Sequence, residues 1–303
     1  MSELQIEQSK NLATVVGKLK EKKLEVKTSS NGKEYMGGYI VLQSDTQYGS
    51  NEIKIAIYQN KLKEDGTVNN IFKGLETVNN VYQIGDLIEA KGYASDESYY
   101  SVQKDQFVNK FGIKASFFNR VNAEEEEERV NLVIEAFIDK INHKEDGVEV
   151  ELISVGFKGV AIPLVATIRE DLVEPFLSLY QPKSTATFNI SVINSVEIEE
   201  EKAPAFGEKS GEKIKRTISK NIIYGGTEPN FTKYNDETIK KALAIRMGRL
   251  EERKEATLSK LNTNTSSAGY SGFNAGIQNN NNNNQNASFG VANLNGGSFG
   301  AFK

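Results

Sequence analysis

The sequence contains no cysteine, a single histidine (His143) and no apolar run of the ~18 residues that a membrane span requires. The absence of cysteine excludes disulfide bonds and every metal site built from thiolates. One histidine is too few for a histidine-based zinc site or a Ser-His-Asp triad, and no Gly-x-x-x-x-Gly-Lys phosphate loop is present. His143 lies in a polar turn, where a surface position is expected. The sequence therefore predicts a protein that is not an enzyme and requires no cofactor.

Charge is distributed unevenly along the 303 residues, although the net charge is only −4. Residues 1–121 carry 16 basic and 15 acidic side chains, residues 122–200 carry 6 and 17, and residues 201–303 carry 15 and 9. An acidic middle thus separates two segments that can approach phosphate without repulsion. This distribution permits binding to nucleic acid but does not by itself indicate it.

Alternating apolar and polar residues in the first 121 positions predict a five-stranded barrel. Alternation with a period of two is typical of strands with one buried face. The clearest case is 52–59, in which three isoleucines alternate with Lys54, Ala56 and Tyr58. The expected strands are residues 14–27, 35–44, 52–59 and the two sides of a hairpin at 85–118, with a helical turn near Leu75 between the third and fourth strands.

A second series of strands follows a run of five glutamates, Glu124–Glu128. The run is interpreted as a solvated linker, because its like charges repel one another. Further strands are expected at residues 131–141, 148–156, 160–168, 184–196 and 215–224, with a short helix over 171–180. Three strands, a helix and two strands repeat the order of the first domain, so the pattern predicts a second barrel.

Two more segments follow the second barrel. Asn235 is a favourable N-cap for an amphipathic helix, whose apolar face is expected to pack on a barrel or a partner subunit. The last 41 residues contain no acid, one base and a run of six asparagines, a composition typical of disorder. The predicted organisation is a polar lead-in (1–11), a first barrel (12–121), an acidic linker (122–129), a second barrel (130–227), a helix (235–262) and a tail (263–303).

The hairpin at 85–118 carries a resemblance to a known family. Gly85–Gly92, the pair Tyr99-Tyr100 and the run Phe111–Val121 resemble the fourth strand, the arm and the fifth strand of bacterial and phage single-stranded DNA-binding proteins. Ile222–Pro229 and Thr238–Leu243 also resemble Gram-positive phage proteins of this role. The resemblance implies a mainly β fold with two tandem OB-fold-like five-stranded barrels, a C-terminal helix and a disordered low-complexity tail.

Single-stranded nucleic acid is bound by cations that neutralise its phosphates and by flat aromatic rings that stack on its bases. Eight of the 12 tyrosines lie between Tyr35 and Tyr100, and tyrosine tolerates the solvent at a wet surface. Alternation places Lys18, Lys20 and Lys22 on one face of the first strand. The predicted nucleic-acid-binding residues are Lys18, Lys20, Lys22, Tyr35, Tyr39, Lys54, Tyr58, Tyr93, Tyr99, Tyr100 and Lys104.

Other aromatic residues are expected in the core. Phe107, Phe111 and Phe117 alternate with polar residues, and Tyr82 precedes a turn, so packing is favoured for all four. Tyr35 and Tyr39 stay open between core and surface. The aromatic residues expected in the core of the second domain are Phe137, Phe157, Phe176, Tyr180 and Phe188. That domain is expected to act as a spacer or protein-contact domain. Only its last strand is positioned to extend a phosphate track, with Lys213, Lys215, Arg216 and Lys220.

The tail offers Phe289, Phe299 and Phe302 as contacts for partner proteins or for other copies of the chain, and a passive tail is the alternative. Bacterial single-stranded DNA-binding proteins recruit partners through an acidic C-terminal end. This tail contains no acid, so that mode of recruitment does not transfer.

The leading functional hypothesis is a non-sequence-specific single-stranded DNA-binding protein that coats exposed strands during phage DNA replication, recombination or repair. Its expected partners are single-stranded DNA, replication or recombination proteins at the tail, and further copies of itself, with no membrane contact. The polar first residues argue against a signal peptide, so the expected location is the cytoplasm, that of the host for a phage protein. A structural or assembly scaffold and a single-stranded RNA binder are the alternatives. Salt dependence separates the scaffold from either nucleic-acid binder.

Overall fold

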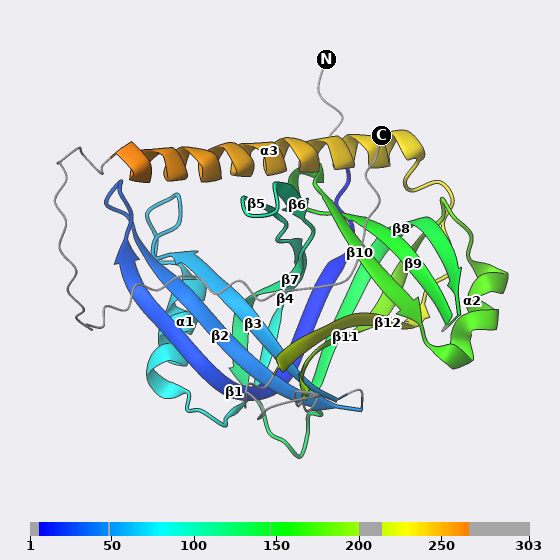
Figure 1. Ribbon diagram of the computed structural model, residues 1–303. Helices are drawn as coiled ribbons and strands as arrows, with labels where there is room; N and C mark the ends of the chain where they lie inside the picture. The colour runs from blue at the N-terminus through cyan, green and yellow to red at the C-terminus, as the bar shows by residue number, and fades with distance from the viewer. Residues whose placement is uncertain (1–5, 48, 146, 200–213, 267–303) are drawn as a thin grey trace, which may run out of the picture. The chain divides into compact units, whose positions relative to one another are not determined.

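The structure, a computed structural model, describes residues 6–47, 49–145, 147–199 and 214–266 (Figure 1). None of the helices in these ranges has both the length and the apolar character needed to cross a membrane. The chain divides into two units. Met1–Thr257 contains both barrels, and Leu258–Lys303 contains the end of the last helix.

Five long strands form the first barrel: β1 (Asn11–Thr28), β2 (Glu34–Thr46), β3 (Gly49–Asn60), β4 (Leu87–Asp96) and β7 (Phe111–Arg120). They follow the order β3-β2-β1-β4-β7, and every neighbouring pair is antiparallel. The alternation predicted for the third strand is confirmed, because Ile53, Ile55 and Ile57 are buried in the core.

The helix α1 (Asn70–Val81) follows β3 and adds one face to the core of the first barrel. It begins at Asn69, whose side-chain oxygen accepts a hydrogen bond of 3.0 Å from the N–H of Ile71. Phe72, Leu75 and Val78 recur every three residues and are fully buried. The helical turn predicted near Leu75 is therefore a full helix.

The second barrel repeats the order of the first, with three strands, a helix and two strands, and its strands form a closed barrel. Its elements are β8 (Arg129–Lys144), β9 (Gly147–Val155), η1 (Phe157–Gly159), β10 (Ala161–Ile168), η2 (Glu170–Leu172), α2 (Val173–Leu179), β11 (Thr185–Glu199) and β12 (Ile214–Gly226). The strand order is β12-β10-β9-β8-β11, and β12 also pairs with β11. β10 and β12 run parallel, with Thr167 opposite Ile222. The prediction of two tandem OB-fold-like barrels is confirmed.

The two barrels share one ten-stranded sheet. The first half of β1 pairs with β4 on one side and with β8 on the other, through the register Asn11 to Ile134 and Val16 to Arg129. A second connection joins β11 to β3, where the side-chain oxygen of buried Asn51 accepts a 2.7 Å hydrogen bond from the N–H of Asn194.

A β-bulge in β1 corrects the predicted placement of its lysines. Leu19 pairs with Leu42 and Glu21 with Val41, so Lys20 is an extra residue without a partner of its own across the strand pair. The bulge reverses the alternation that follows it. Lys22 then lies opposite Ile40, on the core side, and Lys23 lies opposite Tyr39, on the outer side. The prediction that Lys18, Lys20 and Lys22 share one face is wrong.

A second bulge corrects the prediction for Phe117. In β7, Phe117 pairs with Lys91 and Ala115 with Gly92, which leaves Ser116 as an extra residue. Ala115 points into the core, and Phe117 points outward with 60% of its surface exposed. Phe111 does pack against the core, as predicted.

One aromatic residue of the second barrel also departs from the prediction. Phe157 begins η1, outside the alternating strands, and is 69% exposed. The other four aromatic residues assigned to this core are buried: Phe137, Phe176, Tyr180 and Phe188.

A small hairpin and a long helix complete the described chain. β5 (Tyr99–Ser101) and β6 (Gln106–Val108) form an arm between β4 and β7. The helix α3 (Asp236–Ser266) begins after Asn235, whose side-chain oxygen accepts a 2.9 Å hydrogen bond from the N–H of Thr238, as its predicted capping role requires. Figure 1 shows the arm beside α3, and Arg246 of α3 donates a 2.6 Å hydrogen bond to Asn109, which follows β6.

Candidate nucleic-acid interface

Aromatic and basic side chains gather on the outer face of β1, β2 and β3. Residues directly opposite one another in paired strands project from the same side of a sheet. The register therefore places Lys23 beside Tyr39, Lys27 beside Tyr35, and Tyr58 beside Gly37. Met36, Ile40 and Leu42 alternate with the tyrosines of β2 and are buried, which settles the orientation of Tyr35 and Tyr39. The tyrosine face is defined as Lys23, Lys27, Tyr35, Tyr39, Lys54 and Tyr58.

Two rings of this face are in direct contact. The ring centroids of Tyr35 and Tyr58 lie 4.6 Å apart, with their planes inclined by 36°. Gly37 makes this contact possible, because a Cβ at that position would lie 3.0 Å from Cε2 of Tyr35. Tyr58 keeps 67% of its surface exposed. The pair therefore presents aromatic surface to the solvent, where a base can stack.

The third tyrosine is held in place by charged neighbours. The amino group of Lys54 lies 3.8 Å from the ring centroid of Tyr39, within the range of a cation–π interaction. The hydroxyl of Tyr39 donates a 2.5 Å hydrogen bond to Glu21, and this bond raises the pKa of Tyr39 above its ordinary value. Lys54 and Glu21 therefore fix the position of the Tyr39 ring on this face.

The cations of the tyrosine face differ in their partners. Lys23 is exposed and forms no ion pair with any residue that the structure describes. Lys27 lies 3.4 Å from Glu25, an exposed pair of the kind that contributes little to stability. Lys23 and Lys27 were absent from the sequence-predicted set, because only the bulge at Lys20 brings them beside the tyrosines.

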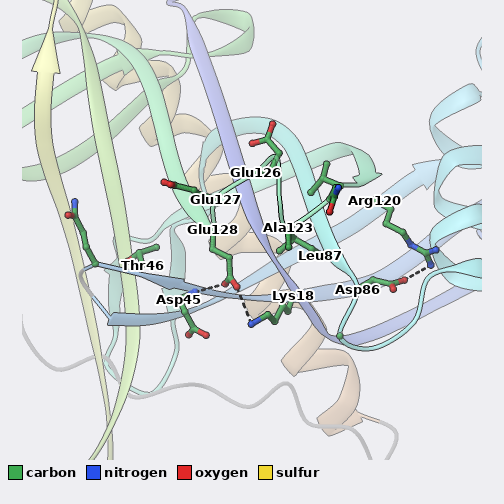
Figure 2. A pocket seen from close by; sticks show the side chains of 14 residues that line it. Lys18, Asp45, Thr46, Asp86, Leu87, Arg120, Ala123, Glu126, Glu127 and Glu128 are labelled. Carbon is green, nitrogen blue, oxygen red and sulfur yellow. Dashed lines mark hydrogen bonds and ion pairs between the residues drawn. The ribbon is translucent and has the colours of Figure 1, made fainter.

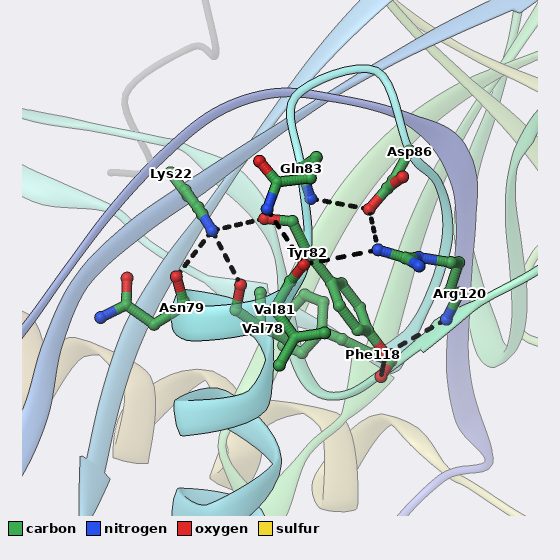
Figure 3. A network of polar contacts seen from close by, with 9 residues as sticks. All are labelled: Lys22, Val78, Asn79, Val81, Tyr82, Gln83, Asp86, Phe118 and Arg120. Atoms are coloured by element: carbon green, nitrogen blue, oxygen red, sulfur yellow. Dashed lines mark hydrogen bonds and ion pairs between the residues drawn. The ribbon is translucent and has the colours of Figure 1, made fainter.

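Lys22 has a structural role instead (Figure 3). Its amino group donates hydrogen bonds of 3.1, 2.7 and 2.6 Å to the carbonyl oxygens of Val78, Asn79 and Tyr82. These carbonyls lie at the C-terminal end of α1, where the helix dipole favours a cation. In the same network Tyr82 donates to the carbonyl of Phe118 at 3.1 Å, consistent with its predicted packing role.

Lys18 and Lys20 meet carboxylates rather than open solvent. Lys18 lies 3.2 Å from Glu128, and Lys20 contacts Glu52. Lys18 lines a hollow with a volume of about 740 Å³. Figure 2 shows it there together with Asp45, Glu126, Glu127 and Glu128. Glu128 accepts a 2.6 Å hydrogen bond from the N–H of Asp45, so this part of the predicted linker is docked on the barrel. Because acids outnumber bases there, the hollow is a poor phosphate site.

The arm residues are divided between surface and interior. Tyr100 is 9% exposed, contacts Asp105 through its hydroxyl, and packs edge-on against Phe107 with 5.6 Å between ring centroids. Tyr99 and Lys104 are exposed, and Lys104 forms no ion pair within the described residues. Tyr93 is also exposed but lies on β4, beside Lys114 of β7, on the outside of the barrel.

The helix α3 fixes the arm to the second barrel. Arg246, which is 7% exposed, forms a buried ion pair with Asp96 at 2.7 Å and donates to Asn109 at 2.6 Å. Two turns later Arg253 donates to the carbonyl of Ser98 at 2.9 Å, and the amino group of Lys254 lies 4.7 Å from the ring centroid of Tyr100. These contacts explain why Tyr100 is not available to a ligand.

The same helix covers the corresponding outer face of the second barrel. Ile239 and Ala242 of α3 form one apolar cluster with Phe137 and Ile153, which project outward from β8 and β9. Nearby lysines of this barrel are paired with acids, Lys140 with Glu151 at 3.1 Å and Lys144 with Glu149 at 2.8 Å. The outer face of β1–β3 is thus open in the first barrel, whereas its equivalent in the second is occupied.

Several predicted residues cannot be placed. Phe289, Phe299 and Phe302 lie outside the described residues, as does Lys213. In the backbone register of β11 and β12, Arg216 lies opposite Glu197 and Lys220 lies opposite Ile193. Lys220 is exposed.

The family model described as YorF matches residues 10–256. No curated protein matches the sequence. Among solved structures, the wild-type single-stranded DNA-binding protein from Thermus aquaticus is 10% identical, with a TM-score of 0.46, and the match covers 74% of this chain and 95% of that chain. A deletion mutant of the same protein is 10% identical with a TM-score of 0.47, and that match covers 76% of this chain and 98% of the other.

Proposed function

The chain belongs to the YorF family, and we propose that it binds single-stranded DNA through the tyrosine face of its first barrel. The observation that carries the proposal is the open sheet surface on which the stacked pair of Tyr35 and Tyr58 lies beside Tyr39 and Lys54. In the second barrel, α3 fills the equivalent surface. The first barrel therefore binds the strand, and the second barrel has a supporting role.

The tyrosine face binds through two separable interactions. Bases stack on the exposed rings, and each such contact contributes ~1–3 kcal/mol. Lys23, Lys27 and Lys54 neutralise phosphates of the backbone as the strand crosses the sheet. Neither interaction distinguishes one base from another, so the binding has no strong sequence preference. A duplex is excluded because its bases are already stacked within the helix.

The proposed biological role is the coating of exposed strands during phage DNA replication, recombination or repair. The protein acts by binding alone, without catalysis or cofactor, in the cytoplasm of the host. Phe289, Phe299 and Phe302 are proposed contacts for replication or recombination proteins and for further copies of the chain. The proposed division of roles gives binding to the first barrel, at 12–121, and a supporting role to the second barrel, at 130–227.

Fluorescence anisotropy with labelled oligonucleotides tests the function. Wild-type protein is expected to bind mixed-sequence and dT single strands, and to bind duplex of the same length far more weakly. If three lysines contact phosphates, the plot of log K against log salt concentration has a slope of about −2, since each phosphate contact contributes about −0.7 for single strands. Tighter binding of the same sequence as RNA would change the proposed ligand. Absence of binding at low salt would leave the scaffold alternative.

A further inference from the structure

A second group of exposed aromatic and basic side chains lies on the outer face of β4 and β7, the two strands of the first barrel that do not contribute to the tyrosine face. Phe117 is 60% exposed and Tyr93 is 47% exposed. The register places Lys91 opposite Phe117 and Lys114 opposite Tyr93, so each ring has a lysine as its direct cross-strand neighbour. This group, the β4–β7 patch, is defined as Lys91, Tyr93, Lys114 and Phe117.

The β4–β7 patch carries net positive charge. Lys114 forms no ion pair with any described residue. Lys91 lies 2.8 Å from Glu89, but that carboxylate is only 8% exposed and also lies 3.9 Å from Arg129. Arg129 is also paired with Glu126 at 2.6 Å, so these two cations are balanced by two acids, and the excess positive charge of the patch is that of Lys114. A ligand at this surface meets two rings and an excess of positive charge.

Core packing does not explain the two aromatic rings. The bulge at Ser116 turns Phe117 away from the core while Ala115, two positions earlier, remains in it. Exposing a phenylalanine ring to water is unfavourable, and exposed apolar side chains that lie together on one face mark a binding surface, as Phe117 and Tyr93 do on neighbouring strands. The cores of protein–protein interfaces are depleted in lysine, whereas surfaces that bind single-stranded nucleic acid combine lysine with stacking rings.

We propose that the β4–β7 patch is a second subsite for the same single-stranded polynucleotide, with bases stacked on Phe117 and Tyr93 and phosphates beside Lys91 and Lys114. This inference rests on the proposed function and extends it from one sheet face to two. A strand long enough to reach both subsites is bound more tightly than one that occupies the tyrosine face alone, because the second contact is intramolecular.

Tryptophan scanning tests the subsite directly, because the chain contains no tryptophan and one introduced residue is the only indole signal. Phe117→Trp is expected to lose fluorescence when a dT strand of about 40 nucleotides is added, and to recover it in high salt. Tyr58→Trp reports the tyrosine face in the same way. Phe157→Trp is the matched control, since Phe157 is also mostly exposed, at 69%, but lies on the second barrel.

Binding measurements with short and long strands provide the second readout. Phe117→Ala/Lys114→Gln is expected to bind a strand of about 8 nucleotides like wild type and a strand of about 40 nucleotides about tenfold more weakly. An equal loss at both lengths would overturn the subsite, because it would indicate general damage to the protein. Circular dichroism of the variant provides the check on folding.

The outcomes separate this inference from the proposed function. Quenching of Tyr58→Trp without quenching of Phe117→Trp would overturn the second subsite and leave the tyrosine face standing. No quenching of either, with no binding by wild type, would overturn the proposed function itself. If Phe117→Trp is not quenched and Phe117→Ala converts a dimer to a monomer in sedimentation, the patch contacts a second copy of the chain instead.

Discussion

At the scale of single residues, the amino group of Lys22 lies within 3.1 Å of three carbonyl oxygens at the C-terminal end of α1. Hydrogen bonds from a charged donor contribute ~1.5–3 kcal/mol, and the helix dipole adds to them. We expect Lys22→Met to lower the free energy of unfolding by about 1–3 kcal/mol in urea denaturation while the folded fraction binds DNA normally.

Lys20→Met is the matched control for this substitution, because Lys20 lies in the bulge of the same strand and forms only an exposed ion pair. Its effect on stability is expected to stay below about 1 kcal/mol. A stable Lys22→Met variant with weakened DNA binding would contradict the structural role of Lys22 and would indicate that Lys22 contacts DNA.

Gly37 is a second single residue on which the tyrosine face depends, because it lies beneath the ring of Tyr35. Its missing side chain allows Tyr35 to lie over the backbone and contact Tyr58. We expect Gly37→Val to displace Tyr35 and weaken binding of dT strands by about fivefold in anisotropy titrations. Stability is expected to change little, since a β-branched residue favours a strand. Gly74→Ala, in a helix with open space around the added methyl group, is the control.

Among the elements, α3 connects the two barrels through the buried pair of Arg246 and Asp96. Removing one partner of such a pair leaves an unpaired buried charge and costs ~3–5 kcal/mol. We therefore expect Arg246→Met to destabilise the protein by about this amount and to speed amide hydrogen exchange in the arm. Lys241→Met removes only an exposed helix pair with Glu237 and is the control. Unchanged exchange in the arm of Arg246→Met would show that α3 does not hold it.

The strands themselves were predictable from alternation, and so was the repeated order of the two barrels. Alternation fails wherever one residue is inserted into a strand, because every later side chain then changes face. Because of the bulge at Lys20, alternation did not place Lys23 and Lys27 on the outer face. Because of the bulge at Ser116, it assigned the exposed Phe117 to the core. No local pattern marks these positions. The docking of α3 on the arm is also invisible locally, since Arg246 and Asp96 are 150 positions apart.

At the scale of the whole molecule, the barrels share a sheet through β1 and β8, which sequence patterns did not reveal. Because these contacts are backbone hydrogen bonds within one sheet, we expect unfolding of either barrel to remove support from the other. Unfolding in urea is followed by the tryptophan fluorescence of Tyr58→Trp, in the first barrel, and of Phe157→Trp, in the second. The two unfolding midpoints should therefore coincide. Two separate midpoints would contradict this coupling.

Binding of DNA at the tyrosine face is tested most directly by comparing two aromatic surfaces of the first barrel. Tyr35→Ala/Tyr58→Ala removes the stacked pair of the tyrosine face, and Tyr99→Ala/Tyr100→Ala removes the two tyrosines of the arm. Anisotropy titration with a labelled dT strand at low and high salt measures both against wild type. We predict that the first variant binds at least about tenfold more weakly and the second is much less affected. Wild-type affinity in Tyr35→Ala/Tyr58→Ala would contradict binding of the strand at the tyrosine face.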